Sequence, residues 1–321
     1  MSLPLVLITA KIPQSVVEQL KNQVELRYWT DSPQMPRATL LDWAKGVDGI
    51  LCLLHDKINN ELLDAAGAQL KVVSTLSVGY DHIDLQACRA HGVKAGNTPG
   101  VLTETTAELA MALLLVTTRR ISEAINAVKD GSWGPWQPEW MTGRDLGGST
   151  VGIVGMGRIG ATLGRLLSGF NCRLLYHDAV PIPANADPIH AQYVSLDTLL
   201  AESDFVSLHT PLTAETSKMV NAEFLGKMKR TAILVNTSRG GVVDQEALYQ
   251  ALKNGVIAGA GLDVTTPEPL PTDHPLLSLP NCVILPHIGS ATIATRLKMA
   301  QMAADNLLAG VQGRSLPNEV K

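Results

Sequence analysis

The sequence lacks the charge pattern of a nucleic-acid-binding protein. Its 26 Lys and Arg residues are outnumbered by 30 Asp and Glu residues, which gives a formal net charge of -4. The basic residues are scattered along the chain rather than gathered into the patch or stripe that binding to a phosphate backbone requires. We therefore expect no nucleic-acid partner, although a few local cations could bind a small anion.

A membrane span and a leader are also missing. The longest apolar run, Leu109–Val116, is far shorter than the roughly 20 residues that a transmembrane helix needs. The N-terminal residues MSLPLVLITAKIP have neither the basic region nor the small-residue cleavage site of a secretory signal. We expect a cytoplasmic protein that makes no membrane contact.

Cysteine is scarce, and its positions argue against disulfides. The four cysteines are Cys52, Cys88, Cys172 and Cys282. They form no C-x-x-C pair, and each lies in or beside an apolar run, as a buried free thiol does. This usage is typical of a reducing compartment.

The length of the chain leaves room for two domains, because 321 residues exceed the usual size of a single hydrophobic core. Short apolar runs alternate with amphipathic stretches from the N-terminus onward, and this alternation predicts a parallel sheet covered by helices on both faces. The expected strands of this first series are Leu5–Ala10, Val24–Trp29, Gly49–Leu54 and Lys71–Leu76, and the expected helices are Val16–Leu20, Leu40–Ala44 and Leu62–Ala66.

A second α/β series follows a helix and a loop. Residues 103–129 form one long helical pattern with Gly131 as a stop signal, and a loop rich in Trp, Gly and Pro comes next. The expected strands of the second series are Val151–Val154, Leu174–His177, Phe205–Leu208, Ala232–Asn236, Ala258–Leu262 and Val283–Leu285. Six such strands make a doubly wound sheet.

The C-terminal stretch Thr292–Val311 is again helical and is too long to be only a tail. We therefore expect this helix to pack back on the first α/β series. The first domain would then be discontinuous, with the second series inserted into it.

The strongest local signal is a glycine motif at Gly155, Gly157 and Gly160. It directly follows the expected strand Val151–Val154 and opens an amphipathic helical stretch, which is the context of a dinucleotide-binding fingerprint. The first glycine permits a tight turn, the second lets a pyrophosphate approach the backbone, and the third lets helix and strand pack closely. The N–H groups and dipole of the helix N-terminus favour the phosphates.

The expected strand Leu174–His177 is followed by Asp178, about twenty residues past the glycines. An acidic side chain at this position accepts hydrogen bonds from the adenosine ribose hydroxyls. A 2'-phosphate about 4 Å away would instead cost on the order of 4 kcal/mol before screening, at an effective dielectric near 20. Asp178 therefore favours NADH over NADPH.

Three ionisable residues stand at strand or loop ends of the second series. They are Arg239 in N-T-S-R-G-G, Glu268 in T-T-P-E-P-L-P and His287 in L-P-H-I-G-S. Ligands of open α/β sheets bind beyond the carboxyl ends of the strands, so their shared placement carries more weight than any single residue.

Together with the glycine motif, the segments N-T-S-R-G-G-V-V-D, G-L-D-V-T-T-P-E-P and L-P-H-I-G-S make the chain resemble the D-isomer-specific 2-hydroxyacid dehydrogenases over essentially its whole length. The segments S-V-G-Y-D-H, T-E-T-T-A-E-L-A and P-L-P-T-D-H-P-L-L are most similar to the branch that reduces glyoxylate and hydroxypyruvate. The resemblance implies an NAD(P)-dependent enzyme that reduces a short 2-oxo acid.

Within this family, Arg239 grips the substrate carboxylate, His287 protonates the carbonyl oxygen, and Glu268 supports the imidazolium. The resemblance implies a Rossmann cofactor domain over residues 100–286, inserted in a discontinuous flavodoxin-like substrate domain over residues 1–99 and 287–321. It assigns no metal. Further cofactor contacts are implied for Arg158, Ile159, Pro211, Thr237, Asp263 and Gly289, and substrate contacts for Leu54, Val78, Gly79, Trp136 and Ser290.

Three of these assignments have an equally good structural interpretation. Asp263, which the resemblance places at the nicotinamide carboxamide, could be a structural buried carboxylate. Leu54 could simply pack in the core, and Trp136, which matches a loop Trp that reaches the partner subunit's pocket in similar proteins, could be an interface anchor. The long helix 103–129 and the Trp-rich loop are the expected surface of a homodimer.

Other functions share parts of this pattern. A dinucleotide-sensing corepressor would use the same fold, but the docking clefts, extra termini or basic surfaces that it would need are not visible. A formate dehydrogenase carries an amide at the position of Glu268, and many phosphoglycerate dehydrogenases carry a further regulatory domain. A phosphite dehydrogenase has a similar strand-end acid and remains a distant alternative.

The cofactor preference is directly testable. The vertebrate members of the glyoxylate-reducing branch prefer NADP and carry small or basic residues where this chain has Asp178. We predict a higher kcat/KM with NADH than with NADPH, measured with one 2-oxo acid at saturating concentration. An equal or higher kcat/KM with NADPH would contradict the role given to Asp178.

Overall fold

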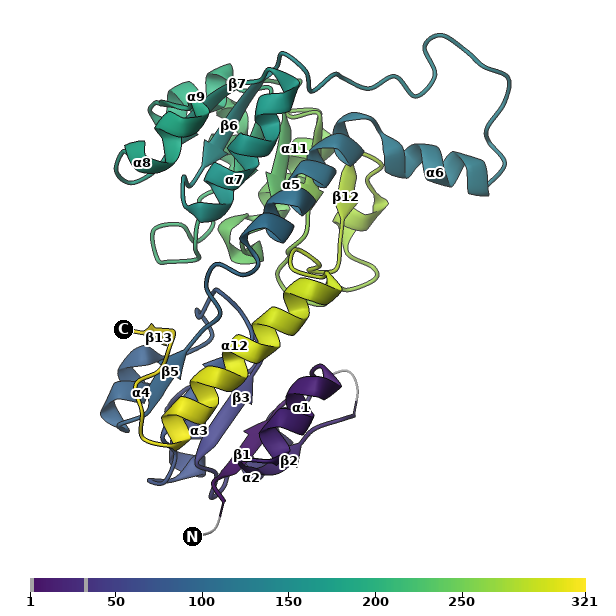
Figure 1. Ribbon diagram of the computed structural model, residues 1–321. Helices are drawn as coiled ribbons and strands as arrows, with labels where there is room; N and C mark the ends of the chain where they lie inside the picture. The colour runs from purple at the N-terminus through teal and green to yellow at the C-terminus, as the bar shows by residue number, and fades with distance from the viewer. Residues whose placement is uncertain (1–2, 32–33) are drawn as a thin grey trace. The chain divides into compact units, whose positions relative to one another are not determined.

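The computed structural model describes residues 3–31 and 34–321, which divide into two compact units. The first unit holds the chain up to Leu102 together with Ser290–Lys321, and the second holds Thr103–Gly289. Both boundaries lie three residues further along the chain than the sequence motifs suggested. Figure 1 shows the course of the chain through both units.

In the described residues the first unit is a six-stranded sheet in the order β13-β5-β4-β3-β1-β2. All pairs are parallel except β13 with β5. Its strands are β1 (Leu5–Ile8), β2 (Glu25–Tyr28), β3 (Gly49–Cys52), β4 (Val72–Thr75), β5 (Lys94–Gly96) and β13 (Glu319–Val320). Its helices are α1 (Gln14–Lys21), α2 (Arg37–Trp43), α3 (Asn60–Ala66), α4 (Leu85–Ala90) and α12 (Ile293–Val311).

The order 2-1-3-4-5 of the first five strands is that of a flavodoxin-like doubly wound sheet, and this confirms the expected fold of the first unit. Helix α12 packs on β3 and β4, so the C-terminal segment does return to the first unit. Close packing requires glycine at Gly310, where a Cβ atom would lie 2.4 Å from the Val72 side chain.

In the described residues the second unit is a seven-stranded parallel sheet in the order β12-β11-β10-β9-β6-β7-β8. Its strands are β6 (Thr150–Val154), β7 (Arg173–His177), β8 (Gln192–Tyr193), β9 (Phe205–Leu208), β10 (Ile233–Asn236), β11 (Gly259–Leu262) and β12 (Cys282–Ile284). Its helices are α5 (Thr103–Thr118), α6 (Ile121–Lys129), α7 (Arg158–Leu167), α8 (Pro183–Ala186), α9 (Leu196–Glu202), α10 (Ala222–Lys227) and α11 (Gln245–Lys253), with short 3-10 turns at 168–170, 187–189, 240–242 and 275–278.

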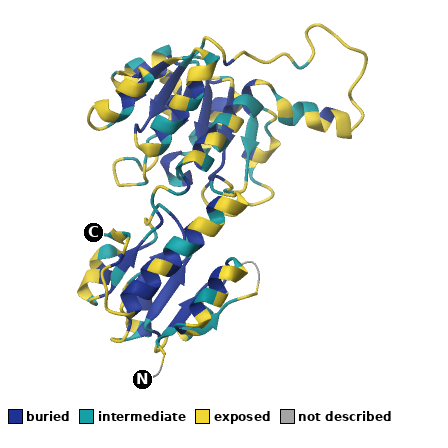
Figure 2. Ribbon diagram, in the orientation of Figure 1, coloured by how far each residue is buried: buried dark blue, intermediate teal, exposed yellow. Residues whose placement is uncertain are grey.

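This strand order is the Rossmann order with one strand added at the edge, which confirms the fold expected for the second unit. Two apolar clusters cover the two faces of the sheet, one including Phe205 with Leu113 and Leu163, the other including Val206 with Leu199 and Leu248. Figure 2 shows the central strands of both units buried and the outer sides of the helices exposed. Among the described residues, no helix has the length and apolarity needed to cross a bilayer.

The single helix expected over residues 103–129 is wrong, because the helix breaks at Arg119 and Arg120. Arg120 adopts a left-handed conformation with φ of 54°. The Thr118 carbonyl accepts a hydrogen bond from the Arg144 N–H (3.1 Å), and the Thr118 hydroxyl donates to the Arg144 carbonyl (3.1 Å). The returning loop therefore satisfies the end of α5 in place of a continuing helix.

Three short strands, β5, β8 and β13, were not expected from the sequence, because two or three residues leave no apolar run to detect. The four cysteines are free thiols: Cys52 and Cys88 are buried, as expected, whereas Cys172 and Cys282 are partly exposed.

Asn306 ties α12 to the edge of the first sheet. Its fully buried amide donates to the Asn97 carbonyl and accepts from the Asn318 N–H, both at 2.9 Å. A Cβ atom on Gly96 would lie 2.9 Å from the Asn306 amide carbon, so glycine is needed for this approach.

We predict that Asn306→Ala lowers the free energy of unfolding by about 1–3 kcal/mol, because it removes the hydrogen-bond partner of two partly buried backbone groups, the Asn97 carbonyl and the Asn318 N–H. Urea denaturation measures this loss. Asp305→Ala, on the exposed face of the same helix, is the control and should cost about 0.5 kcal/mol or less. Equal losses in the two variants would contradict the assigned role of Asn306.

Candidate active site

The candidate residues of the second unit gather at one edge of its sheet. The sheet order reverses between β6 and β9, which makes the carboxyl ends of these strands the switch point where doubly wound folds bind ligands. Each candidate side chain follows a strand of this sheet: the glycine motif follows β6, Asp178 follows β7, Pro211 follows β9, Thr237 and Arg239 follow β10, Asp263 and Glu268 follow β11, and His287 and Gly289 follow β12.

The glycine motif is built for close approach. Gly155 has φ of 97°, and a Cβ atom there would lie 2.7 Å from the His209 carbonyl oxygen. A Cβ atom on Gly160 would lie 2.2 Å from the Gly155 carbonyl oxygen. Around Gly157, in contrast, no atom lies within 4 Å of the Cβ position. The first and third glycines thus serve packing, while the backbone at the second is open to a ligand.

Helix α7 begins at Arg158, with Gly157 at its N-cap and no side-chain cap. The first helical hydrogen bond runs from the Ala161 N–H to the Gly157 carbonyl. The N–H groups of Arg158, Ile159 and Gly160 therefore have no helical acceptor and can bind phosphate oxygens, with the helix dipole in support.

Asp178 is connected to this loop. One carboxylate oxygen accepts a hydrogen bond from the Met156 N–H and the other from the Ala179 N–H, both at 2.8 Å. Each oxygen retains a second lone pair that can accept a ribose hydroxyl.

His209 lies beneath the glycine loop, at the end of β9. Burial lowers the pKa of its imidazole to about 4, and the ring is hydrogen-bonded to the Ser207 hydroxyl at 2.9 Å. The ring is therefore neutral near pH 7. It adds no positive charge beside the glycine loop, where the N-terminus of α7 favours an anion.

Two buried hydroxyls at the same edge, Thr210 Oγ1 and Thr237 Oγ1, have no hydrogen-bond partner among the described residues. Buried hydroxyls normally have one. Together with the open backbone at Gly157 and the N-terminus of α7, these groups fit a dinucleotide that spans from β7 to β10. Thr237 was expected from the sequence, whereas Thr210 was missed, although its place just after β9 and before Pro211 could have indicated it.

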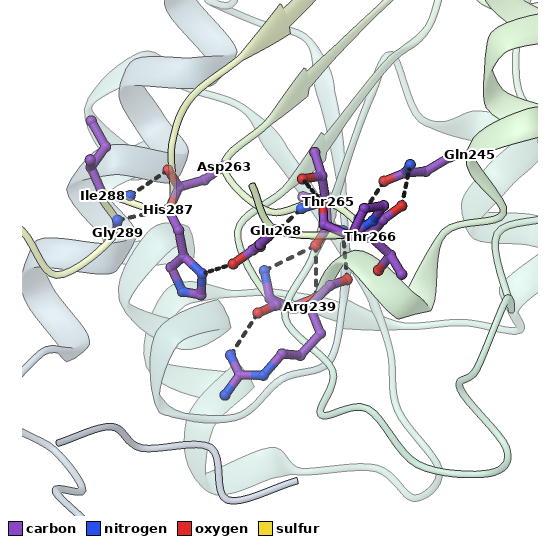
Figure 3. A network of polar contacts seen from close by, with 12 residues as sticks. Arg239, Gln245, Asp263, Thr265, Thr266, Glu268, His287, Ile288 and Gly289 are labelled. Carbon is purple, nitrogen blue, oxygen red and sulfur yellow. Dashed lines mark hydrogen bonds and ion pairs between the residues drawn. The ribbon is translucent and has the colours of Figure 1, made fainter. Parts of the chain in front are cut away.

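Asp263 ties the end of β11 to the turn that follows β12. Its two carboxylate oxygens accept hydrogen bonds from the N–H groups of Ile288 and Gly289, both at 2.7 Å, and its main-chain carbonyl accepts from the His287 N–H at 2.9 Å (Figure 3). Burial raises the pKa of this carboxyl, against the opposing effect of the two N–H groups. These contacts support a structural role for Asp263.

His287 and Glu268 form a hydrogen-bonded pair (Figure 3). The His287 Nδ1 lies 2.7 Å from Glu268 Oε2, and the side chains are 25% and 30% exposed. The other carboxylate oxygen accepts from the Thr265 N–H at 3.0 Å. Because the carboxylate is an acceptor, Nδ1 carries a proton and Nε2 remains available to a ligand.

Burial raises the pKa of Glu268, but the hydrogen bond and charge of His287, the Thr265 N–H and the charge of Arg239 outweigh it. The pKa therefore lies below its ordinary value, and Glu268 is ionised at neutral pH. A carboxylate held in this way stabilises a protonated imidazole.

Arg239 projects from the turn after β10 toward the same region (Figure 3). The Asn236 amide shapes this turn: it donates to the Arg239 carbonyl at 2.9 Å and accepts from the Ser238 N–H at 2.9 Å. A Cβ atom on Gly240 would lie 2.0 Å from the Thr265 carbonyl oxygen, so glycine lets this turn approach the segment that carries Glu268. The structure thus brings Arg239, Glu268 and His287 to one place.

The remaining candidates lie elsewhere. Leu54 follows β3 in the first unit, is half-buried and does not belong to the apolar cluster of Leu7, Ile50 and Val73 in that sheet's core. Ser290 is the first residue of the returning C-terminal segment. Trp136 lies in the loop after α6 with 85% of its surface exposed, so it is not part of the cluster in its own chain.

Val78 and Gly79 follow β4 in the first unit. Their carbonyls accept hydrogen bonds from the Asn97 amide (2.8 Å) and the Ser77 hydroxyl (2.7 Å). Because the C=O and N–H of a trans peptide point in opposite directions, these two bonds orient the N–H groups of Gly79 and Tyr80. The Val78 N–H is oriented in the same way by the Ser77 carbonyl, which accepts a hydrogen bond from the Thr98 N–H at 2.9 Å.

The amino-acid sequence is similar to those of known dehydrogenases. Residues 111–289 match the NAD binding domain of the D-isomer specific 2-hydroxyacid dehydrogenases. The chain is 53% identical over 298 residues to the glyoxylate reductase/hydroxypyruvate reductase of Mus musculus, covering 92% of this chain and 91% of that protein, and 50% identical over 319 residues to the Homo sapiens protein of the same name, covering 98% and 97%.

Solved structures show the same similarity. A protein from Thermus thermophilus superposes with a TM-score of 0.93 at 47% identity, covering 99% of this chain and 100% of that one. An NADPH-dependent glyoxylate/hydroxypyruvate reductase from Sinorhizobium meliloti superposes with a TM-score of 0.86 at 35% identity, covering 99% and 97%.

The low pKa of Glu268 predicts a pH-dependent contribution to stability. Because the pKa is lower in the folded state, the ionised carboxylate contributes stability above the unfolded value of about 4.3, and this contribution is lost as pH falls through the folded pKa. We predict that Glu268→Gln is less stable than the wild type near pH 6 and that the difference closes toward pH 3. Chemical denaturation across this range measures it, and a pH-independent difference would contradict the assignment.

Proposed function

The chain belongs to the D-isomer-specific 2-hydroxyacid dehydrogenases, and we propose that it reduces glyoxylate or hydroxypyruvate to glycolate or D-glycerate with hydride from NAD(P)H. The observation that carries the proposal is the 2.7 Å contact between His287 and Glu268 beside Arg239, at the carboxyl edge of a sheet with a dinucleotide motif. The resemblance found in the sequence motifs is confirmed by relatives that are about half identical over nearly the whole chain.

His287 is the proposed proton donor. Its Nδ1–H is held by Glu268, so Nε2 would give its proton to the carbonyl oxygen of the substrate as the alkoxide forms. When bound, NAD(P)H supplies the hydride. Glu268 offsets the charge of the imidazolium before transfer.

Arg239 is the proposed carboxylate anchor. Its planar fork of donors suits a bidentate grip on a 2-oxo acid and can polarise the adjacent carbonyl. Val78 and Gly79 would add backbone N–H groups to the same carboxylate, and Leu54 and Ser290 would line the substrate. The orientation of the Val78–Gly79 loop by Ser77 and Asn97 supports this assignment.

The dinucleotide would lie along the carboxyl edge of the second sheet. Gly155, Gly157, Arg158, Ile159 and Gly160 would take the pyrophosphate, with Asp178 at the adenosine ribose. Pro211, Thr237, Asp263 and Gly289 would lie near the nicotinamide half. The Sinorhizobium relative is NADPH-dependent, but the Asp178 carboxylate supports NADH here because a 2'-phosphate would be repelled.

We predict turnover with both glyoxylate and hydroxypyruvate, and a lower pH optimum for reduction than for oxidation of the hydroxy acid. Reduction needs a protonated His287, whereas oxidation needs a neutral His287 that accepts the proton. Initial rates in both directions across a range of about pH 5–9, which brackets the ordinary histidine pKa, test this. Absence of turnover with any short 2-oxo acid would contradict the proposed function, and identical pH profiles would contradict the role of His287.

The second copy of the chain is the proposed partner. Helix α6 exposes Ile121, Ile125 and Val128, spaced by four and three residues on one face, and they are 38%, 49% and 60% exposed. The loop that follows exposes Trp133, Trp136 and Trp140. Figures 1 and 2 show α6 and this loop extending from the rest of the second unit, with the loop largely exposed. Such a patch favours a protein interface.

We predict that the protein sediments at twice the 34.3 kDa of one chain and that Ile125→Glu with Val128→Glu shifts it to the monomer, because both charges would enter an apolar interface. Leu277→Glu, at a site as exposed as Ile125 (49%), is the control. A wild-type monomer, or a dimer unaffected by the double change, would contradict the proposal. Trp136→Ala adds a test of whether this side chain reaches a substrate, through its effect on substrate preference.

The proposed location is the cytoplasm. Four free thiols support it, because oxidising compartments favour disulfides.

A further inference from the structure

The segment that carries Glu268 belongs to no helix or strand. It follows β11, and residues 263–269 are irregular. A side chain on such a segment keeps a fixed position only if other contacts hold the backbone. The Glu268 carboxylate nevertheless makes two directed hydrogen bonds, to Thr265 and to His287, so something outside the segment has to fix it.

Gln245 makes one such contact, at the middle of the segment. Its Oε1 accepts a hydrogen bond from the Thr266 N–H at 2.6 Å, and its Nε2 donates to the Thr266 carbonyl at 2.7 Å (Figure 3). The side-chain amide thus pairs with both polar groups of one backbone residue, as a neighbouring strand would. Two bonds of opposite direction fix the orientation of the Thr266 peptides as well as their position.

The base of Gln245 is rigid. It is the first residue of α11, whose N-cap Asp244 accepts hydrogen bonds from the N–H groups of Glu246 and Ala247. The helix is anchored by Leu248 and Leu252 in the apolar core. The amide of Gln245 therefore transmits the position of a packed helix to an irregular segment.

Within residues 263–269, short hydrogen bonds connect the part that Gln245 contacts to Glu268. The Thr265 hydroxyl donates to the Pro267 carbonyl at 2.9 Å, and the Thr265 N–H donates to Glu268. Thr266, the residue that Gln245 holds, lies between these two ends. With Thr266 released, the Thr265–Glu268 contact could remain while the whole segment moved relative to His287.

We propose that Gln245 is a positioning residue that holds the Glu268 segment so that its carboxylate meets His287 Nδ1. The inference rests on the proposed function, because it gives Gln245 a role in preparing the proposed acid. The two Gln245 bonds are exposed, so water can replace them, and their loss should affect placement more than stability.

The chain offers a matched control on the same helix. Gln250 is also a glutamine of α11; it is exposed, whereas Gln245 is partly exposed, and its amide donates to Glu246 within the helix at 3.0 Å. Replacing either glutamine by Met keeps length and helix propensity and removes both polar groups. Three other titratable groups lie near the Glu268–His287 pair and Gln245. Arg239 and Asp263 face Glu268, and the Nε2 of His274 lies 3.5 Å from the Gln245 amide nitrogen.

The first test is kinetic, with glyoxylate and NADH. We expect Gln245→Met to lower kcat about tenfold, as misplacement of a catalytic group does, with KM for NADH unchanged. The acid limb of the pH profile should move to higher pH, because Glu268 without its hydrogen bond to His287 protonates more readily. Gln250→Met should match the wild type. Unchanged kcat in Gln245→Met, or equal losses in both variants, would overturn the proposal.

The second test does not depend on turnover. At a pH high enough for the His287 imidazole to be neutral, nitrogen NMR of the wild type should show its one remaining proton on Nδ1, with the signal assigned by its loss in His287→Ala. Gln245→Met should mix the two tautomers, whereas Gln250→Met should not. A fixed Nδ1–H tautomer in Gln245→Met would overturn the proposal even if the enzyme turns over glyoxylate. A mixed tautomer would support it even if glyoxylate is not the substrate, so failure of the two proposals is distinguishable.

Discussion

The turn after β12 depends on one buried carboxylate. Asp263 accepts hydrogen bonds from the N–H groups of Ile288 and Gly289 and, through its main chain, from His287. His287 has φ of 54°, a left-handed conformation that costs a non-glycine residue roughly 1–2 kcal/mol. Asp263 accepts three hydrogen bonds from this turn, each worth about 0.5–1.5 kcal/mol net, and together they offset that cost. The imidazole is therefore directed from a strained backbone, and Glu268 completes its orientation from the side.

The carboxyl ends of β6, β7 and β9, where we propose that the dinucleotide binds, are also held by few contacts. Asp178 accepts a hydrogen bond from the Met156 N–H in the glycine loop, and we propose that the same carboxylate binds the adenosine ribose, so a change at this residue would be expected to alter both the loop and the choice of cofactor. The packing of Gly155 against His209 joins the two strands at the switch point. The shape of the glycine loop thus depends on a few short contacts to β7 and β9.

The sequence permitted much of this to be predicted and some of it not. Strand ends and the glycine motif were accessible because period and glycine spacing are local signals. Arg239, Glu268 and His287 were predicted because each follows an expected strand and lies in a segment that resembles the 2-hydroxyacid dehydrogenases; strand-end placement alone would not have distinguished them from ordinary surface or core residues. The break at Arg120 was not, because it is Arg144, far along the chain, that satisfies the end of α5. Gln245 was not, because its partner Thr266 is 21 residues distant and nothing in the local pattern of α11 marks it.

The most direct test of the account is single-turnover reduction of glyoxylate by NADH, compared between the wild type and His287→Ala by stopped flow. The account predicts that the substitution slows hydride transfer by at least about 100-fold, the contribution of a general acid. The dissociation constant of NADH should stay within about twofold, because His287 follows β12, and β11, β10 and β9 lie between it and β6, the strand that leads into the phosphate loop. Hydride transfer at the wild-type rate in His287→Ala would contradict it.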